Sequence, residues 1–500
     1  MDKTIKVDAF TSKDLPFKKV GNLWATINIS APSNNNIVPV PAMDFILVID
    51  ISGSMRANKK MATVKAAIHY MLDQLKNINN GYRLAVITFN NSVDVITGDI
   101  ENNGLVSLTP DNVEQIIGKL NEIKPEGATN MSGALETAME LINDREIKNP
   151  STILFFTDGY ANVGKMGRDF TFQLSNIKNS MPDNLSIHTF GIDQDHDSTL
   201  LRIISSLSKC GIYYYVESTG VIGKMFASCL ATILYTAAYN VTVKVEAQKG
   251  CRIIQKFSKF PITETETESC KKFTVQFGSI SFEESRTILV KLSINKAELG
   301  KQHLLKVTVD YSKALTNGAE SASCELFINR SDTEILQVRN PHIDLHYWRY
   351  TVAATIEDAV REINTSRDEE RFASAQSKII QLKDKMEKEA PEFCAEQFGK
   401  DYLHILEEMV LGMKNSQTYS AGIHYADSYI SALYLERNTG YSFLKGMQEV
   451  VKNLSYVPLV EFERRLYFSS YVTTYQSKQS EQVTKALDRY VAFYVSPSDD

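Results

Sequence analysis

The stretch Asp44-Phe-Ile-Leu-Val-Ile-Asp50-Ile-Ser52-Gly-Ser54 decides how this chain begins to fold. A continuous apolar run between polar residues is typical of a parallel strand whose two faces are both covered by helices. Asp50, Ser52 and Ser54 then place oxygen atoms on a tight turn, which Gly53 allows. Oxygen ligands on short side chains suit a hard cation such as Mg²⁺. The sequence therefore predicts an ion site at the carboxyl end of a buried strand, where open α/β sheets bind their ligands.

Two later motifs supply ligands of the same kind. Gly127-Ala-Thr129-Asn-Met-Ser-Gly-Ala-Leu135 places a hydroxyl in a loop just before an amphipathic helix, and Thr152-Ile-Leu-Phe-Phe-Thr-Asp158-Gly159 is a second apolar strand that ends in Thr-Asp-Gly. With all three motifs in this order, residues 42–236 resemble a von Willebrand factor type A (VWA) domain with a complete metal-ion-dependent adhesion site. The resemblance implies that the ion is held, directly or through water, by Asp50, Ser52, Ser54, Thr129 and Asp158.

The same resemblance implies a function without catalysis. Only two of the five ligands are charged, so a bound Mg²⁺ keeps an exchangeable position that a carboxylate from a partner protein can fill. Mn²⁺ accepts the same ligands, and the sequence does not choose between the two ions. In the family, a change at the Thr129 loop can move the closing helix, predicted here at residues 220–235. We treat such a switch in this chain as a hypothesis.

Length and composition limit the alternatives. Five hundred residues suggest about three domains, and 43% hydrophobic with 23% charged residues is typical of a globular protein. The formal charge of −6 argues against nucleic acid as a partner. The six cysteines form no Cys-x-x-Cys pair, which favours a reducing compartment. With no signal peptide and no apolar stretch long enough to span a membrane, we expect a cytoplasmic protein.

The hydrophobic period predicts a multi-domain α/β + β + α fold. Strands predicted at 44–51, 83–89, 152–157, 186–191 and 212–216 alternate with helices, which indicates a doubly wound, mostly parallel VWA sheet over residues 41–237. Alternating apolar residues then predict an antiparallel β sandwich over 238–335, and we expect the strands in residues 1–40 to complete it. Residues 336–500 are predicted to be helical, with an internal bundle favoured over a coiled-coil dimer and a last helix at 480–495; the architecture of 441–500 is not predicted.

A more specific resemblance concerns the carboxyl-terminal half. Residues 188–197 and 225–230 resemble adhesion-type domains of intracellular eukaryotic proteins, which carry a downstream β domain and a helical tail of the Vwaint type; Asn340-Pro-His-Ile-Asp344 fits the start of that tail. Some such proteins resemble ubiquitin ligases with an amino-terminal RING finger. This chain has neither the room nor the cysteines for one, so ligase chemistry is not expected.

Other clusters have a structural interpretation beside the functional one. Asp193, Asp195 and Asp197 are either an acidic rim that tunes partner choice or, as we favour, a loop and helix-cap cluster. His342 and His346 lack further zinc ligands nearby, which favours a surface or interface role.

Enzymatic interpretations find little support. Residues 159–165 imitate a phosphate loop, but Met166 stands where a Ser or Thr would bind magnesium. Ser52 lies outside a nucleophile elbow. We therefore predict no enzyme. The alternatives are a scaffold with a structural metal whose helical region binds partners, and an accessory subunit of a ubiquitin-ligase-type assembly; the oligomeric state stays open.

Overall fold

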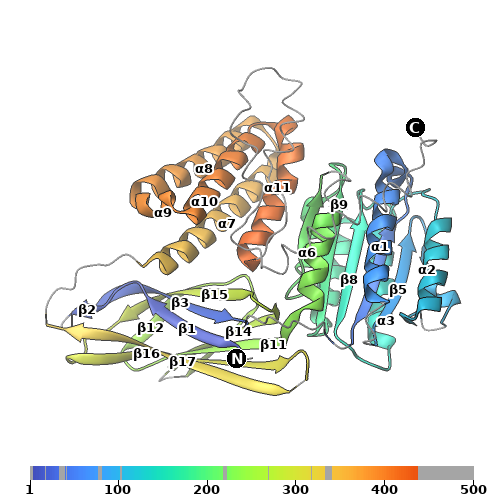
Figure 1. The fold of residues 1–500 in the computed structure, drawn as a ribbon. Coiled ribbons are helices and arrows are strands. Elements are labelled where there is room, and N and C mark those ends of the chain that lie inside the picture. The colour runs from blue at the N-terminus through green and yellow to red at the C-terminus, as the bar shows by residue number, and fades with distance from the viewer. Residues whose placement is uncertain are drawn as a thin grey trace. The chain divides into compact units, whose positions relative to one another are not determined.

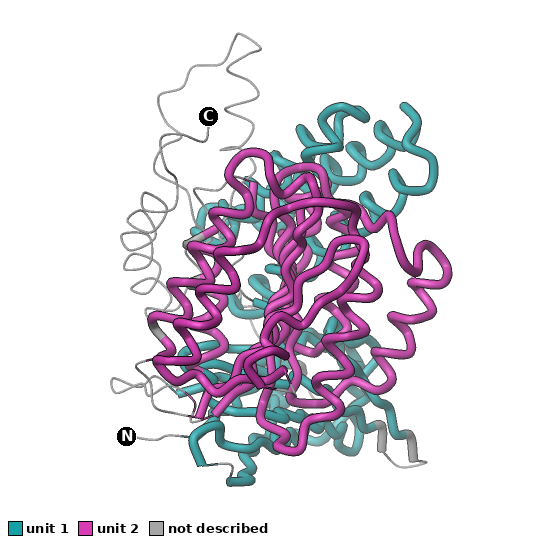
Figure 2. Tube along the Cα trace, turned by 90° about the vertical axis from the view of Figure 1, so that its right-hand side faces the viewer, with its two compact units in different colours: residues 1–37, 236–422, 432–437 teal, residues 38–235, 423–431, 438–500 magenta. Residues whose placement is uncertain are grey.

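The computed structural model describes residues 4–16, 19–32, 40, 42–76, 81–101, 104–217, 222–267, 270–316, 318–332 and 340–436. The chain divides into two compact units (Figure 2): residues 1–37, 236–422 and 432–437 belong to unit 1, whereas residues 38–235 and 423–431 belong to unit 2. The boundaries 1–40, 41–237, 238–335 and 336–500 stay predictions. The helix predicted at 480–495 and the rest of 441–500 lie outside the described residues.

Unit 2 is built on one mixed sheet whose strands run in the order β10-β9-β8-β4-β5-β6, with β7 also paired to β5. The neighbouring strands from β10 to β5 pair in parallel, and β6 and β7 run antiparallel to β5. The strands are β4 (Asp44–Asp50), β5 (Arg83–Phe89), β6 (Val93–Val95), β7 (Val106–Ser107), β8 (Ser151–Thr157), β9 (Leu185–Ile192) and β10 (Tyr213–Val216). All five strands predicted for this part of the chain are therefore members of one sheet.

The helices of unit 2 alternate with these strands (Figure 1). They are η1 (Gly53–Lys59), α1 (Lys60–Leu75), η2 (Ile96–Asp99), α2 (Pro110–Glu122), α3 (Met131–Asp144), α4 (Gly167–Asn179), α5 (Ser198–Ser205) and α6 (Ile222–Leu234). Local sequence explains their bounds: α2, for example, begins with a proline after Thr109, whose side chain accepts a hydrogen bond from the Asn112 N–H. Every residue of β4 is buried, as expected for a central strand covered on both faces.

The strand order creates a switch point beside β4. From β4 the chain first adds β5 on one side, and it later returns to add β8 on the other side. The connections that leave β4 and β8 therefore run away from each other, and this leaves a crevice at the carboxyl ends of the two strands. Asp50 is the last residue of β4 and Asp158 directly follows β8, so the topology places both acids at that crevice.

Unit 1 contains two sheets, with strand orders β1-β3-β15-β12 and β13-β14-β11-β16-β17-β2. The long strand β3 pairs antiparallel with β15 from Gly21 opposite Ile294 to Ser30 opposite Ser285. Alternate residues such as Val241, Val243 and Val245 are fully buried, which gives these strands one core face. The strands are β1 (Lys6–Thr11), β2 (Leu15–Pro16), β3 (Gly21–Ser30), β11 (Thr236–Ala247), β12 (Cys251–Phe257), β13 (Ile262–Thr267), β14 (Cys270–Ser281), β15 (Ser285–Ile294), β16 (Gly300–Lys313) and β17 (Ala319–Ser331).

The helical region begins at α7, which packs against α8 and α10. Residues predicted to form apolar stripes, among them Val352 and Ile356 on α7 and Phe372 and Ile379 on α8, are buried within this single chain. None of the helices seen in the described ranges has the length and hydropathy of a membrane span. The helices are α7 (Pro341–Ser366), α8 (Glu369–Glu389), α9 (Pro391–Ala395), α10 (Gln397–Gly412) and α11 (Ser416–Leu435).

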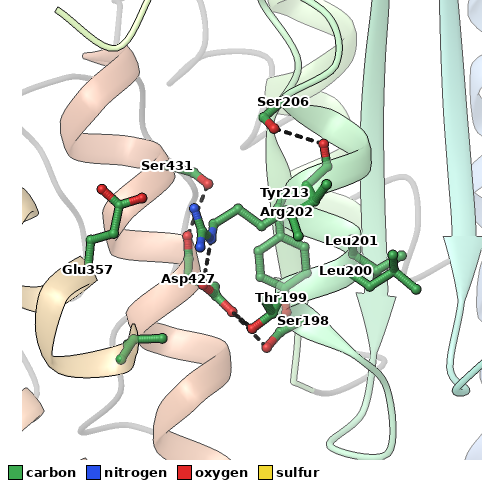
Figure 3. Close-up of polar contacts among 12 residues, drawn as sticks. Ser198, Thr199, Leu200, Leu201, Arg202, Ser206, Tyr213, Glu357, Asp427 and Ser431 are labelled. Atoms are coloured by element: carbon green, nitrogen blue, oxygen red, sulfur yellow. Dashed lines mark hydrogen bonds and ion pairs between the residues drawn. The ribbon is translucent and has the colours of Figure 1, made fainter. Parts of the chain in front are cut away.

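Residues 423–431 of α11 belong to unit 2 and are held there by buried polar contacts. The fully buried Asp427 accepts a hydrogen bond from Arg202 Nε at 2.6 Å on one carboxylate oxygen. Its other oxygen accepts from the hydroxyls of Ser198 at 2.9 Å and Thr199 at 3.1 Å. Figure 3 shows the Asp427 carboxylate between the Arg202 guanidinium and the two hydroxyls, which come from the start of α5. Side chains of α5 therefore anchor this segment within unit 2.

Candidate metal centre

The five side chains predicted to hold an ion lie at the carboxyl edge of the parallel sheet. Asp50 ends β4, Ser52 and Ser54 lie on the turn that follows, Thr129 precedes α3, and Asp158 follows β8. The Ser54 hydroxyl donates to Asp158 Oδ1 at 2.7 Å, and its oxygen lies 3.0 Å from the Ser52 hydroxyl. The hydrogen bond from Ser54 to Asp158 thus links the first and third motifs across 104 residues of sequence.

Asp50 is buried, and the part of the chain that the structure describes provides no cation in contact with it. Its Oδ1 accepts from the Ser52 N–H at 2.8 Å and its Oδ2 from the Thr157 hydroxyl at 2.5 Å. Burial raises the pKa of Asp50 to about 6; the hydrogen bonds from Thr157 and Ser52 oppose this rise, and the nearby Asp158 charge adds to it. Among the ion pairs of the described residues, none involves Asp50. A bound cation would balance this carboxylate and favour its ionised form.

Thr129 is brought to the same place by contacts of its loop. The Gly53 N–H donates to Gly127 O at 3.0 Å, and the Thr129 N–H donates to Asn162 Oδ1 at 2.7 Å. Gly159 also matters, because a Cβ added there would lie only 3.3 Å from Thr129 Oγ1 and 3.9 Å from Ser54 Oγ. The absence of a side chain at position 159 therefore lets the end of β8 approach both hydroxyls.

The donor set fits a hard divalent cation. It consists of two carboxylates and three hydroxyls, all oxygen, as Mg²⁺ and Mn²⁺ prefer. Asp50, Ser52, Thr129 and Asp158 are buried, whereas Ser54 is exposed, so the group opens to solvent on the Ser54 side. Bound there, the ion would supply positive charge and a coordination position facing that opening.

A zinc site is not found among the described residues, where no three His, Cys, Asp or Glu side chains gather in a way that could hold a metal. His342 instead lies 3.3 Å from the Thr26 hydroxyl through its Nδ1, and its ring centroid is 5.1 Å from that of Phe10. His346 is buried. The two histidines therefore take part in packing within unit 1.

Lys60 is a member of the site that the sequence did not lead us to predict. Its ammonium lies 2.8 Å from Asp158 Oδ2 and 3.3 Å from Asp193 Oδ2, and its side chain is only 5% exposed. Burial by itself lowers the pKa of Lys60, but its bond to Asp158 and its attraction to both carboxylates outweigh this and raise that pKa. The only local signal is a pair of lysines at a helix start, where acidic residues are normally preferred.

The three acidic residues of the loop after β9, Asp193, Asp195 and Asp197, have different surroundings. The Asp197 side chain caps α5 by accepting from the Leu200 N–H at 2.9 Å. Asp193 reaches the candidate metal centre through Lys60; burial raises the pKa of Asp193, but the Gln194 N–H and Lys60 outweigh this and lower it. Asp195 is exposed. A rim function for these acids stays a prediction.

Comparison with known proteins agrees with this geometry. The sequence model of the family described as von Willebrand factor type A domain matches residues 44–228. Residues 44–228 form a VWA domain. The match covers β4 through most of α6, so it contains all five candidate ligands together with Lys60 and the acidic loop.

Curated relatives match only part of this chain and part of their own length. Inter-alpha-trypsin inhibitor heavy chain H2 from Mesocricetus auratus is 30% identical over 45% of this chain and 24% of its own length. The same heavy chain from Mus musculus is 28% identical over 43% of this chain and 22% of its own. The uncharacterized protein YfbK of Escherichia coli strain K12 is 23% identical over 52% of this chain and 44% of its own length. The chain thus spans less than half the length of each.

Solved structures resemble a larger part of the chain. A von Willebrand factor type A protein from Catenulispora acidiphila matches with a TM-score of 0.62 and 16% identity over 81% of this chain and 89% of its own. The ArnB paralog VWA2 from Sulfolobus acidocaldarius matches with a TM-score of 0.53 and 14% identity over 86% of this chain and 97% of its own. The human COPII-coat protein Sec24c matches with a TM-score of 0.51 and 12% identity over 81% of this chain and 59% of its own. At such low identity these matches show a shared fold alone.

Proposed function

We propose that this protein binds a partner protein through a divalent ion in a complete metal-ion-dependent adhesion site. The ion, Mg²⁺ in the cell with Mn²⁺ as a substitute, is held by Asp50, Ser52, Ser54, Thr129 and Asp158. The observation that carries the proposal is the convergence of these oxygen ligands at one sheet edge, where Ser54 is exposed to solvent. VWA domains commonly serve as protein-interaction modules, and this agrees with the proposal.

The partner is recognised by an Asp or Glu side chain. The exposed position of Ser54 leaves a coordination position of the ion open, and a carboxylate is the anionic oxygen ligand that a partner protein can supply there. The chain's own residues hold and orient the ion, while contacts at Gly127 and Asn162 fix the backbone that carries Thr129. Affinity for the partner then depends on the metal.

The remaining parts of the proposal concern context. We place the protein in the cytoplasm, where the five cysteines whose side chains are described, none of them in a disulfide bond, would stay reduced. We also propose that it has no enzymatic activity, because Ser52 lies outside a nucleophile elbow. The helices after residue 340 are proposed to be of the Vwaint type.

Metal binding by purified full-length protein tests the first step. Titration with MgCl₂ or MnCl₂, followed by calorimetry, should show one site in the wild type. Asp50→Ala should abolish it, and Thr129→Ala should weaken it. Asp99→Asn is the matched control, since Asp99 is an exposed acid on the same unit and should bind metal like the wild type. Equal metal binding by the wild type and Asp50→Ala would contradict the proposed site.

Partner capture from a cell lysate tests the second step. A protein retained with Mg²⁺ by the wild type and by Asp99→Asn, but lost with EDTA and with folded Asp50→Ala, would support ligand binding through the ion. A set of bound proteins that is unchanged under all these conditions would refute it. Such a result would instead favour a scaffold whose metal is structural and whose helical region binds partners.

A further inference from the structure

Lys60 places a fixed positive charge against one of the two acids of the candidate metal centre. Its Nζ lies 2.8 Å from Asp158 Oδ2, while the other oxygen of Asp158 accepts from the Ser54 hydroxyl. A flexible surface lysine would leave such a position easily, but this side chain is 5% exposed and also meets Asp193 at 3.3 Å. The position of the Lys60 ammonium beside Asp158 is therefore fixed by burial and by two ion pairs.

The backbone around Lys60 is shaped to hold it there. Asn58 and Lys59 both have positive φ, 52° and 58°, directly before α1 begins at Lys60. Asp193 also has positive φ, 62°, and its carboxylate accepts from Asn58 Nδ2 at 3.4 Å. Of the seven non-glycine residues with positive φ in the described ranges, three thus lie in or directly beside the ion-pair bridge that Lys60 forms with Asp158 and Asp193. Asn and Asp adopt this conformation more readily than other non-glycine residues, whereas Lys59 is held in it only because its surroundings enforce it.

Charge counting shows what the lysine does to a bound ion. Asp50, Asp158 and Asp193 with Lys60 carry three negative charges and one positive charge, which leaves a formal charge of −2. A divalent cation cancels this charge, so an incoming carboxylate is not repelled. Without Lys60 the same ion would leave −1, which holds the metal more tightly and opposes an anionic ligand.

We propose that Lys60 is a specificity-determining residue that lowers the metal affinity of this site and thereby favours an anionic ligand on the bound metal. This inference rests on the proposed function, because it assumes that a divalent ion binds beside Asp158. When no metal is bound, the same ammonium balances Asp158 and stabilises the domain. A metal ion that binds at this site therefore meets an Asp158 carboxylate whose negative charge Lys60 has already partly neutralised.

The test compares MnCl₂ affinity, measured by calorimetry on the full chain, between the wild type and Lys60→Gln. The variant should bind Mn²⁺ about tenfold more tightly, or about 1.4 kcal/mol. A merely structural role would give the opposite sign, because a distorted site binds metal more weakly. Lys119→Gln is the matched control, since Lys119 forms a 2.6 Å ion pair with Asp99 on the surface of the same unit and should leave the affinity unchanged.

The possible results separate the two proposals. If the wild type and Asp50→Ala show no difference in Mn²⁺ binding, the proposed function itself fails. If Asp50→Ala abolishes binding but Lys60→Gln binds Mn²⁺ equally or more weakly, only the role of Lys60 is overturned.

A second variant covers the case in which Lys60→Gln does not fold. Asp193→Asn alters a side chain that is 32% exposed and removes one negative charge from the bridge. It should weaken Mn²⁺ binding about threefold or more. An affinity equal to or higher than that of the wild type would overturn the charge-balance proposal.

Discussion

Replacing Arg202 by Met should destabilise the attachment of residues 423–431 to the VWA sheet. Asp427 has no exposed surface in its side chain, and Arg202 Nε at 2.6 Å is the cation that balances it. The variant leaves the carboxylate with only the hydroxyls of Ser198 and Thr199 as donors. Breaking a buried ion pair on one side costs about 3–5 kcal/mol, because the remaining charge is desolvated and unpaired.

Hydrogen exchange read by mass spectrometry measures this cost where it arises. A loss of about 3 kcal/mol in the free energy of local opening corresponds to roughly hundredfold faster amide exchange in residues 423–431. Arg202→Met combined with Asp427→Leu should recover most of the loss, since it removes the unpaired charge together with its partner.

A surface ion pair supplies the control. Lys119 lies 2.6 Å from Asp99, but the two side chains are 30% and 76% exposed. Lys119→Met should therefore cost less than about 1 kcal/mol and leave exchange in residues 423–431 unchanged. The reasoning would be refuted if Arg202→Met accelerated exchange there no more than Lys119→Met does.

Two further predictions concern stability. Gly211→Ala should lower the free energy of unfolding in urea by more than about 2 kcal/mol, because its Cβ would lie 2.1 Å from a backbone oxygen that cannot move aside. Gly98→Ala, with open space around its Cβ, should change this free energy little, and equal effects of the two substitutions would contradict the prediction. Burial lowers the pKa of His424 to about 4, so the unfolded chain, with a pKa near 6.5, binds more protons and stability is lost as pH falls from about 6.5 to about 4. His424→Gln, whose amide can still donate to Gln194 O, should reduce the loss between pH 7 and pH 5 by about 2 kcal/mol, and it also removes the His424 charge that helps to lower the pKa of the neighbouring His196; an unchanged pH profile would contradict this.

The central strand illustrates what local sequence determines well. The run from Phe45 to Ile49 is wholly apolar and wholly buried, because a strand in the middle of a covered parallel sheet needs apolar side chains on both faces. The acid that follows such a strand is placed at the carboxyl edge by strand geometry alone. Asp50 and Asp158 could therefore be predicted to lie at one edge once both strands had been recognised.

The difference between the two acids that bound this strand came only from the tertiary structure. Asp44 and Asp50 look alike in sequence, yet Asp44 accepts from Arg83 at 2.8 Å and from Arg145 at 2.6 Å. Those arginines lie 39 and 101 residues away. Asp44 is thus a neutralised structural anchor, whereas Asp50 is left for a cation.

Lys60 escaped prediction for the same reason. Its partners Asp158 and Asp193 are distant in sequence, and the one local signal, a pair of lysines at a helix start, does not say which acids they meet. Asn58 and Lys59, both with positive φ, directly precede it, and the lysine adopts this conformation only because the surrounding fold enforces it.

By itself, the sequence determined where the strands and helices lie, which faces are apolar, and which polar residues follow each strand, since these depend on period and on neighbours along the chain. The tertiary structure decided that β3 pairs with β15 and that residues 423–431 of α11 join the VWA unit. Such pairings join segments hundreds of residues apart. Their selection depends on the summed burial and hydrogen bonding of the whole fold, and no local pattern records that sum.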